Sequence, residues 1–189
     1  MISIEVNVPA ERLDRMERVR LAESLTAHRL LGSAEETGEI GADPGVLALY
    51  ESLTTVSVRE HDVWIADRVT VDLTVGTWAK DMASHLVAAV SRRLEEAGFE
   101  QSIVYVRGIA EGCYGLDGEI VGISAFTGMI DRAKVNSTED APEGSFIDPV
   151  CGAVVPAEQA VLLELDGEVH GFCCPGCRGH FAKKRRKTL

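Results

Sequence analysis

The chain has 189 residues, of which 46% are hydrophobic, and a formal net charge of −11. This length and composition predict one globular domain, or one domain with a small module, and give no sign of wholesale disorder. No apolar run approaches the length of a helical membrane span, and the acidic excess argues against nucleic-acid binding as the main function.

The first 60 residues show the periodicity of a strand-helix-strand unit. Alternating apolar and polar residues indicate a half-buried strand at each end, and a charged stretch without proline or glycine indicates a helix after the first strand. A loop rich in helix breakers comes next. In chain order we expect a strand at 2–8, a helix at 11–31, a loop at 32–45, a short helix at 46–53 and a strand at 54–58.

A second strand-helix-strand unit follows. Strict alternation predicts strands at 69–75 and 102–106. Two such units side by side predict a four-stranded sheet with both helices on one face, which is an α+β fold whose open face an oligomer would cover. Between the two strands, apolar residues recur every four positions along one helical face: Trp78, Met82, Leu86, Val90 and Leu94.

Six segments of these units carry a shared pattern, namely 8–9, 18–26, 69–76, 86–90, 103–107 and 112–118. Together they resemble the fused two-repeat members of the tautomerase superfamily, over about residues 1–130. The last segment is similar to the Trp-Gly-x-x-Gly turn that closes each tautomerase unit. The resemblance implies a β-α-β repeat fold, usually trimeric when the units are fused, and acid–base chemistry on enols and oxo acids.

The catalytic role of such a domain stays open in this chain. Tautomerases use an N-terminal proline amine as the base, because burial lowers the pKa of that amine toward neutrality, whereas this sequence has Ile2 instead. Arg59 and Arg107 stand where the family's strand arginines bind a substrate carboxylate, or are plain surface residues. Cys113 is either a nucleophile or a packed side chain. The catalytic candidates are therefore Arg107 and Cys113.

The C-terminal part of the chain carries four of the five cysteines. Residues 131–147 are polar and predict a linker. Residues 154–169, with one glycine turn, predict a hairpin whose closure brings Cys151 toward Cys173 and Cys177. Thiolates that converge in this way suit zinc, Cu(I) or iron. The candidate metal ligands are Cys151, Cys173, Cys174 and Cys177.

Two runs in this region, Asp148–Gly152 and Gly167–Phe181, resemble the YHS/TRASH family of small metal-binding domains. That family occurs in copper-handling ATPases, metal sensors and some oxygenase subunits, and the resemblance covers about residues 146–182. Cys174 departs from the family, which usually has serine there. The fourth ligand is therefore open among Cys174, His170, His180 and an exogenous group. The matching positions are Cys151, Cys173, Cys177 and Phe181.

The expected organisation is a duplicated β-α-β, tautomerase-like domain at 1–130, a linker at 131–147, a zinc-ribbon-like TRASH module at 148–182 and a basic tail at 183–189. A module this small barely buries a core, so a bound metal is expected to help fold it. The tail is either a solvated terminus or a contact for RNA, acidic lipid or an acidic neighbour.

Three functions fit these patterns. The first is metal binding, with zinc expected and Cu(I) or iron as alternatives, in metal handling or sensing on a homo-oligomeric and preferably trimeric scaffold, with a protein partner for metal transfer. The second is an isomerase or lyase with a structural zinc, and the third is an accessory subunit of a larger metalloenzyme. The start of the sequence shows no signal peptide, so we expect a reducing cytoplasmic compartment, which disfavours a disulfide.

Overall fold

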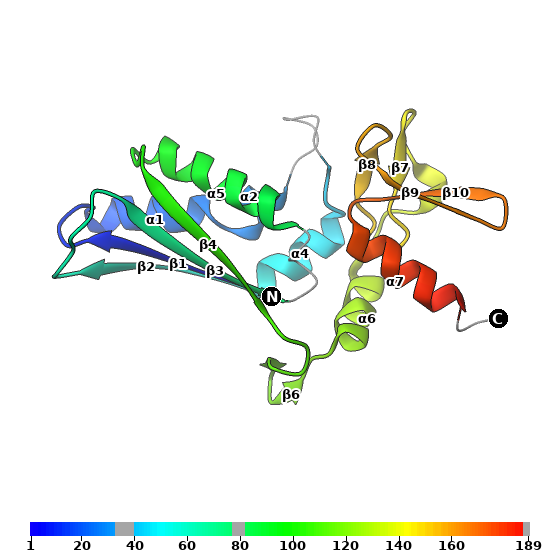
Figure 1. Cartoon of the computed structure of the whole chain (residues 1–189), viewed down its shortest axis with the longest axis horizontal. Coiled ribbons are helices and arrows are strands. Elements are labelled where there is room, and N and C mark those ends of the chain that lie inside the picture. Colours follow the sequence, from blue (N-terminus) through cyan, green and yellow to red (C-terminus); the bar gives the residue numbers. More distant parts are fainter. Residues whose placement is uncertain (33–39, 77–81, 187–189) are drawn as a thin grey trace. The chain divides into compact units, whose positions relative to one another are not determined.

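The structure is a computed structural model that describes residues 1–32, 40–76 and 82–186 (Figure 1). No helix within these three ranges combines the length and the apolar character that crossing a membrane requires. The predicted helical position Trp78 lies outside the described residues.

The chain divides into two compact units, and each unit combines segments that are far apart in the sequence. The first consists of Met1–Leu30 and Tyr50–Gly115, and the second of Leu31–Leu49 and Leu116–Leu189. The second unit therefore includes a stretch that sequence patterns assign to the tautomerase-like domain.

The first unit contains a four-stranded mixed sheet. Its order is β2-β1-β3-β4, in which the outer pairs β1–β2 and β3–β4 are parallel and the central pair β1–β3 is antiparallel. Each parallel pair is one strand-helix-strand unit, so the predicted α+β architecture with two repeated units is confirmed. The strands are β1 (Ile2–Pro9), β2 (Thr54–His61), β3 (Val69–Gly76) and β4 (Ser102–Ile109).

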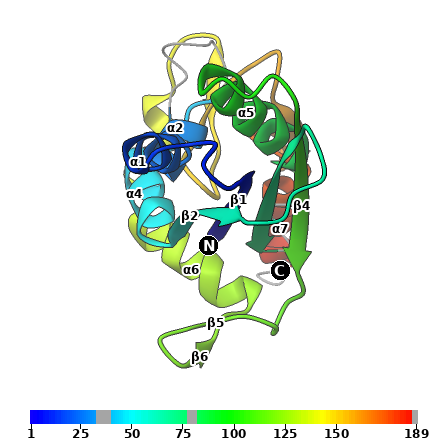
Figure 2. The same cartoon turned by 90° about the vertical axis from the view of Figure 1, so that its left-hand side faces the viewer.

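The helices of this unit cover one face of the sheet (Figure 2). Leu86, Val90 and Leu94 of α5 (Ala83–Glu96) are buried, as their four-residue spacing predicts. They meet the alternate strand residues that point inward, because successive side chains of a strand point to opposite faces. The buried strand residues are Ile2, Ile4, Val6, Val8, Val69, Val71, Leu73 and Val75.

The single helix predicted at 11–31 is wrong in one respect, because two helices occupy this stretch. α1 (Arg15–Ser24) begins with a capping box between Asp14 and Glu17, and α2 (Ala27–Leu31) follows after a break. At the break, the Thr26 hydroxyl donates to the carbonyl of Glu23. Thr26 thus starts the second helix, since serine and threonine hydroxyls compete with the helical backbone for hydrogen bonds.

The other face of the sheet is polar and carries ion pairs. Arg59 lies 3.0 Å from Glu5, and Arg107 lies 2.6 Å from Asp72. Asn7 on the same face contacts both Asp72 and His61. Two large apolar side chains of β4, Ile103 and Tyr105, are also exposed on this face, so it presents apolar surface among its charged groups.

The second unit begins with the short segment before α4 (Pro44–Ser52), a helix that runs on into the first unit. A hairpin links the two units along the chain, with Asp117 and Gly118 at φ 52° and 87° in its turn. The remaining elements of the second unit include two small antiparallel sheets, β7–β8 and β9–β10. In order, the later elements are β5 (Gly115–Leu116), β6 (Glu119–Ile120), α6 (Ile123–Ala133), η2 (Thr138–Asp140), β7 (Ser145–Ile147), β8 (Val154–Pro156), β9 (Val161–Leu165), β10 (Glu168–Phe172) and α7 (Pro175–Arg186).

The hairpin predicted at 154–169 is shorter than expected. β9 and β10 form it, with Asp166 and Gly167 at φ 55° and 82° in a two-residue turn, as an Asp-Gly pair favours. β8 instead pairs with β7 and bridges to Gly41. The residues expected to form a linker hold the end of α6, η2 and β7.

Candidate metal centre

A tight turn after β7 positions Cys151. Asp148 at its start is fully buried, and its Oδ1 accepts hydrogen bonds from the backbone N–H of Val150 at 2.8 Å and of Cys151 at 3.3 Å. Gly152 closes the turn in the left-handed region, at φ 72°, which glycine adopts at little cost. The Asp-Pro-Val-Cys-Gly string is therefore a turn that fixes the direction of one sulfur.

The end of β10 and the start of α7 position the other three cysteines. Cys173 follows β10 directly, and Cys177 lies in the first turn of α7. Cys174 is the N-cap of this helix, since its carbonyl accepts from the N–H of Arg178 at 3.2 Å. The Cys174 sulfur accepts from the N–H of Cys177 at 3.5 Å. Pro175 occupies the first helical position, where proline is favoured.

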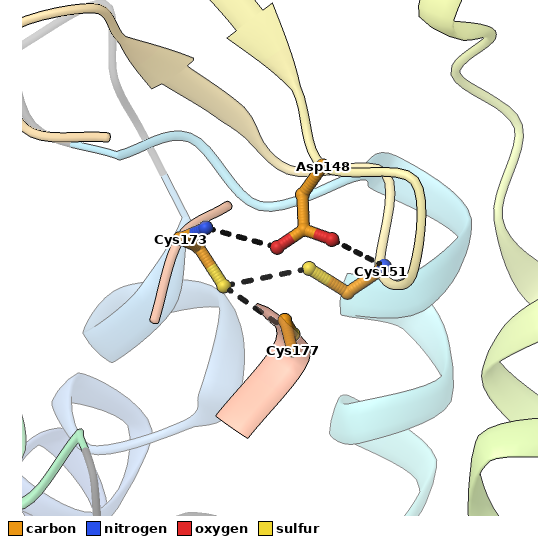
Figure 3. Close-up of side chains that lie close together, drawn as sticks. All are labelled: Asp148, Cys151, Cys173 and Cys177. Carbon is orange, nitrogen blue, oxygen red and sulfur yellow. Dashed lines mark hydrogen bonds between the residues drawn. The ribbon is translucent and has the colours of Figure 1, made fainter. Parts of the chain in front are cut away.

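Three sulfurs converge at this point (Figure 3). Sγ of Cys173 lies 3.6 Å from Sγ of Cys151 and 3.7 Å from Sγ of Cys177. Sulfur atoms around a tetrahedral zinc ion lie about 3.8 Å apart when each Zn–S bond is about 2.3 Å. The arrangement therefore already has the spacing that a thiolate metal site needs.

The fourth member of the group is a carboxylate. The ligand atoms of Asp148 and the three converging cysteines lie within 4.8 Å of one another, so this group could hold a metal ion. Sequence patterns place Asp148 in the matching run but do not identify it as a site residue. The predicted ligand Cys174 and the two alternatives, His170 and His180, are outside this group.

Asp148 ties the two ends of the site together. Its Oδ2 accepts a hydrogen bond of 2.9 Å from the backbone N–H of Cys173, while its Oδ1 binds the turn that carries Cys151. Both oxygens thus already have backbone partners, and the residue acts first as a brace between the two cysteine segments. Burial and the nearby Cys151 sulfur raise the pKa of Asp148 to about 7.

The crowded sulfurs cannot all ionise together without a cation, because like charges at this distance repel. Hydrogen bonds from Cys173 and Cys177 lower the pKa of Cys151. The same interactions raise the pKa of Cys173 and the pKa of Cys177. Hydrogen bonds from Cys173 and Cys177 lower the pKa of Cys174 to about 2. A bound cation would relieve the repulsion and displace the remaining thiol protons.

A second buried acid, Asp43, supports the turn from a distant part of the sequence. Its Oδ1 accepts from the N–H groups of Gly45 and Val46 at the start of α4. Its Oδ2 accepts from the N–H groups of Val135 and Asn136, at 2.9 and 2.7 Å. In the sequence, Asp43 lies in the segment 32–45 that is predicted as a loop, and no local pattern connects it to the cysteines.

Asp43 also lies directly against the glycine that closes the cysteine turn. A Cβ on Gly152 would come 2.6 Å from Oδ2 of Asp43, so the close approach requires glycine. The amide of Asn136 donates to the carbonyl of Gly152 at 2.7 Å. The segment around residue 136 thereby holds the turn from its other side.

The remaining predicted positions in this unit pack around the site. The Phe181 ring lies 5.4 Å from that of Phe172 and 4.9 Å from that of His170, and Phe172 is fully buried. Nε2 of His170 lies 3.7 Å from a carboxylate oxygen of Glu168. His180 lines a pocket with Asp131 and two lysines, and Pro149 and Val150 of the cysteine turn line the same pocket.

The catalytic candidates lie in the first unit. Arg107 is held in its ion pair with Asp72, and Arg59 in its ion pair with Glu5. Cys113 is exposed and sits in a turn, where its N–H donates to the carbonyl of Ala110.

No protein-family model matches the chain, so the YHS/TRASH resemblance rests on the residues that carry it. No curated protein matches the sequence either. Among solved structures, a fused 4-OT described as an asymmetric trimer is 12% identical, covers 62% of this chain and 94% of its own, and gives a TM-score of 0.46.

Two further solved structures are similar to the chain at the same level. A macrophage migration inhibitory factor-like protein from Entamoeba histolytica is 13% identical over 64% of this chain and 98% of its own, with a TM-score of 0.46. A member of the cis-3-chloroacrylic acid dehalogenase family is 18% identical over 63% of this chain and 82% of its own, with a TM-score of 0.43. The α+β architecture of the first unit follows from its own strand order, β2-β1-β3-β4.

Proposed function

We propose that the second unit binds a metal ion through the thiolates of Cys151, Cys173 and Cys177, and that the protein handles or senses this metal. The observation that carries the proposal is the convergence of the three sulfurs at separations of 3.6 and 3.7 Å. The sequence brings them together from two segments more than 20 residues apart through a dedicated turn, a hairpin and a helix start.

The donor set favours a metal with affinity for sulfur. Thiolates select zinc, Cu(I) or iron over magnesium and calcium, which prefer oxygen ligands. Asp148 offers an oxygen, but its hydrogen bonds to three backbone N–H groups compete with coordination. Zinc, as the metal bound in resting protein, fits three sulfurs with one further ligand. Cu(I), as a transported or sensed metal, suits the same thiolate donors.

Thiolate ligands need a reducing compartment, which we take to be the cytoplasm. The first unit serves as a scaffold, and we propose that it assembles into a homo-oligomer, with a trimer favoured, through the exposed sheet. A partner protein would deliver or accept the metal.

Elemental analysis of the full-length protein, purified under reducing conditions, tests this function. We expect close to one zinc, copper or iron ion per chain, and loss of most of it in Cys173→Ser and Cys177→Ser. Cys113→Ser is the matched control, since that thiol is exposed and belongs to the first unit. Equal metal content in the Cys173→Ser variant and in the control would overturn the proposal.

A further inference from the structure

The fourth clustered cysteine, Cys174, has a position unlike that of the other three. Cys151, Cys173 and Cys177 belong to the group of converging ligand atoms, and Cys174 does not. Its sulfur lies at the N-terminus of α7, in contact with the N–H of Cys177, and the peptide bond holds it next to Cys173. It is therefore beside the site without being part of it.

Capping alone does not account for a cysteine here. The Cys174 sulfur accepts the N–H of the third helical residue, which is the bond that an N-cap serine, threonine or aspartate makes with oxygen. An N-cap serine makes the same bond with oxygen, so capping does not require sulfur. The presence of cysteine at this position points to a use of the sulfur itself.

We propose that Cys174 is the transfer ligand of the metal site, a sulfur that takes the ion from the three-cysteine site and presents it to an incoming thiol. This inference rests on the proposed metal binding and names how the ion enters and leaves. The alternative fourth donor, Asp148, is fully buried and braces two segments. Cys174 is partly exposed, as the three converging cysteines are, but it is outside their ligand group, so its sulfur is available to an outside ligand.

The exchange changes ligands and no oxidation state. A metal–sulfur bond to the Cys174 thiolate would form as the bond to Cys177 breaks, so the ion would keep three thiolates and Cys177 would leave as a thiolate. The incoming thiol then repeats the step by displacing Cys174. Tethering Cys174 beside the site makes the first displacement intramolecular, which gives it a high effective concentration.

Loading the full-length protein with Cd²⁺ tests the assignment, because sulfur-to-cadmium charge-transfer absorption reports the number of bound thiolates. We compare wild type with Cys174→Ser, which keeps an N-cap oxygen, and with Cys174→Ala, which removes the cap. Both variants should keep one Cd²⁺ per chain and the wild-type absorption. Transfer of Cd²⁺ to excess soluble dithiol should slow about tenfold in both, equivalent to roughly 1.4 kcal/mol of barrier.

Three results would overturn the inference. An absorption loss of about one quarter in Cys174→Ser would make Cys174 a permanent fourth ligand. An unchanged transfer rate, equal to that of the Cys113→Ser control, would show that Cys174 takes no part in transfer while the proposed metal binding stands. Absence of Cd²⁺ binding by the wild type would instead remove the proposed function, and this inference with it.

Discussion

The backbone N–H of Cys173 donates a hydrogen bond of 2.9 Å to Oδ2 of Asp148, across 25 positions of sequence. This bond joins the end of β10 to the turn after β7, and it places the sulfurs of Cys173 and Cys151 within 3.6 Å. Backbone contacts to one buried carboxylate therefore help to assemble the site.

Asp148→Ala should lower the free energy of unfolding by about 3 kcal/mol, because three backbone N–H groups lose their acceptor in a buried place. It should also weaken metal binding, because the two cysteine segments are no longer braced. Denaturant titration and metal analysis measure the two effects. Glu158→Ala is the control, since Glu158 is exposed, and a change within about 0.5 kcal/mol is expected there. Similar losses for both variants would show that Asp148 is not a brace.

Gly152→Ala and Gly144→Ala form a matched pair, because both glycines have φ near 73°, at 72° and 74°. Alanine at Gly144 meets nothing within 4 Å, so we expect only the left-handed strain of about 1 kcal/mol. Alanine at Gly152 would also press on Oδ2 of Asp43 and displace its hydrogen bonds, for a total loss of about 3 kcal/mol. Equal losses in denaturant titrations of the two variants would contradict the role given to Asp43.

The alternation of apolar and polar residues predicted the strands of the first unit well, because each strand buries one of its two faces. The alternation at 2–8, 54–58, 69–75 and 102–106 corresponds to β1, β2, β3 and β4, since alternation is the direct signature of a half-buried strand. The break near Thr26 was missed, because side-chain capping inside a charged stretch leaves no trace in hydrophobic periodicity.

The cysteine site was predicted in part, for a similar reason. Cysteines beside glycine and proline turns mark a metal site on spacing alone, so the meeting of Cys151 with Cys173 and Cys177 was expected. Asp43 was missed because its role depends on hydrogen bonds to residues more than 90 positions away. The N-cap role of Cys174 depends on where α7 begins, and residues 175–186 carry no apolar periodicity that predicts a helix.

Asp131 should give the second unit a pH-dependent contribution to stability. Burial alone would raise the pKa of Asp131, but hydrogen bonds from Lys134 and Lys184 outweigh it and hold the pKa below its ordinary value. The ionised form is thus favoured by folding, so the stabilisation is present above the unfolded pKa of about 3.9 and is lost as the pH falls through the folded pKa.

Asp131→Asn therefore should unfold more easily than wild type at pH 7, and the gap should close at acid pH. Lys134 also donates to the carbonyl of Pro149 in the cysteine turn, so Asp131 helps orient a lysine that supports the site. Denaturant midpoints measured between pH 7 and pH 3 give the result. A gap that stays constant over this range, as for a purely steric change, would contradict the charge argument.

Metal removal should loosen the second unit and leave the first intact. The cysteine segments, β9 and β10 bury few apolar side chains, whereas β1 and β3 supply eight of the buried core residues. A metal ion that binds only the folded state adds to its stability in proportion to the logarithm of its excess over Kd, so a chelator removes that contribution from the second unit alone.

Hydrogen exchange with and without chelator measures the loss of stability residue by residue. We expect amides of residues 161–177 to lose protection at least tenfold, a change of about 1.4 kcal/mol, while amides of β1 and β3 keep theirs. Cys177→Ser should show the same loss before chelation and no further loss after it. An equal loss of amide protection in β1 and β3 would mean that the ion stabilises the chain as a whole. No loss of protection in residues 161–177 would mean that the cysteine segments fold without the ion.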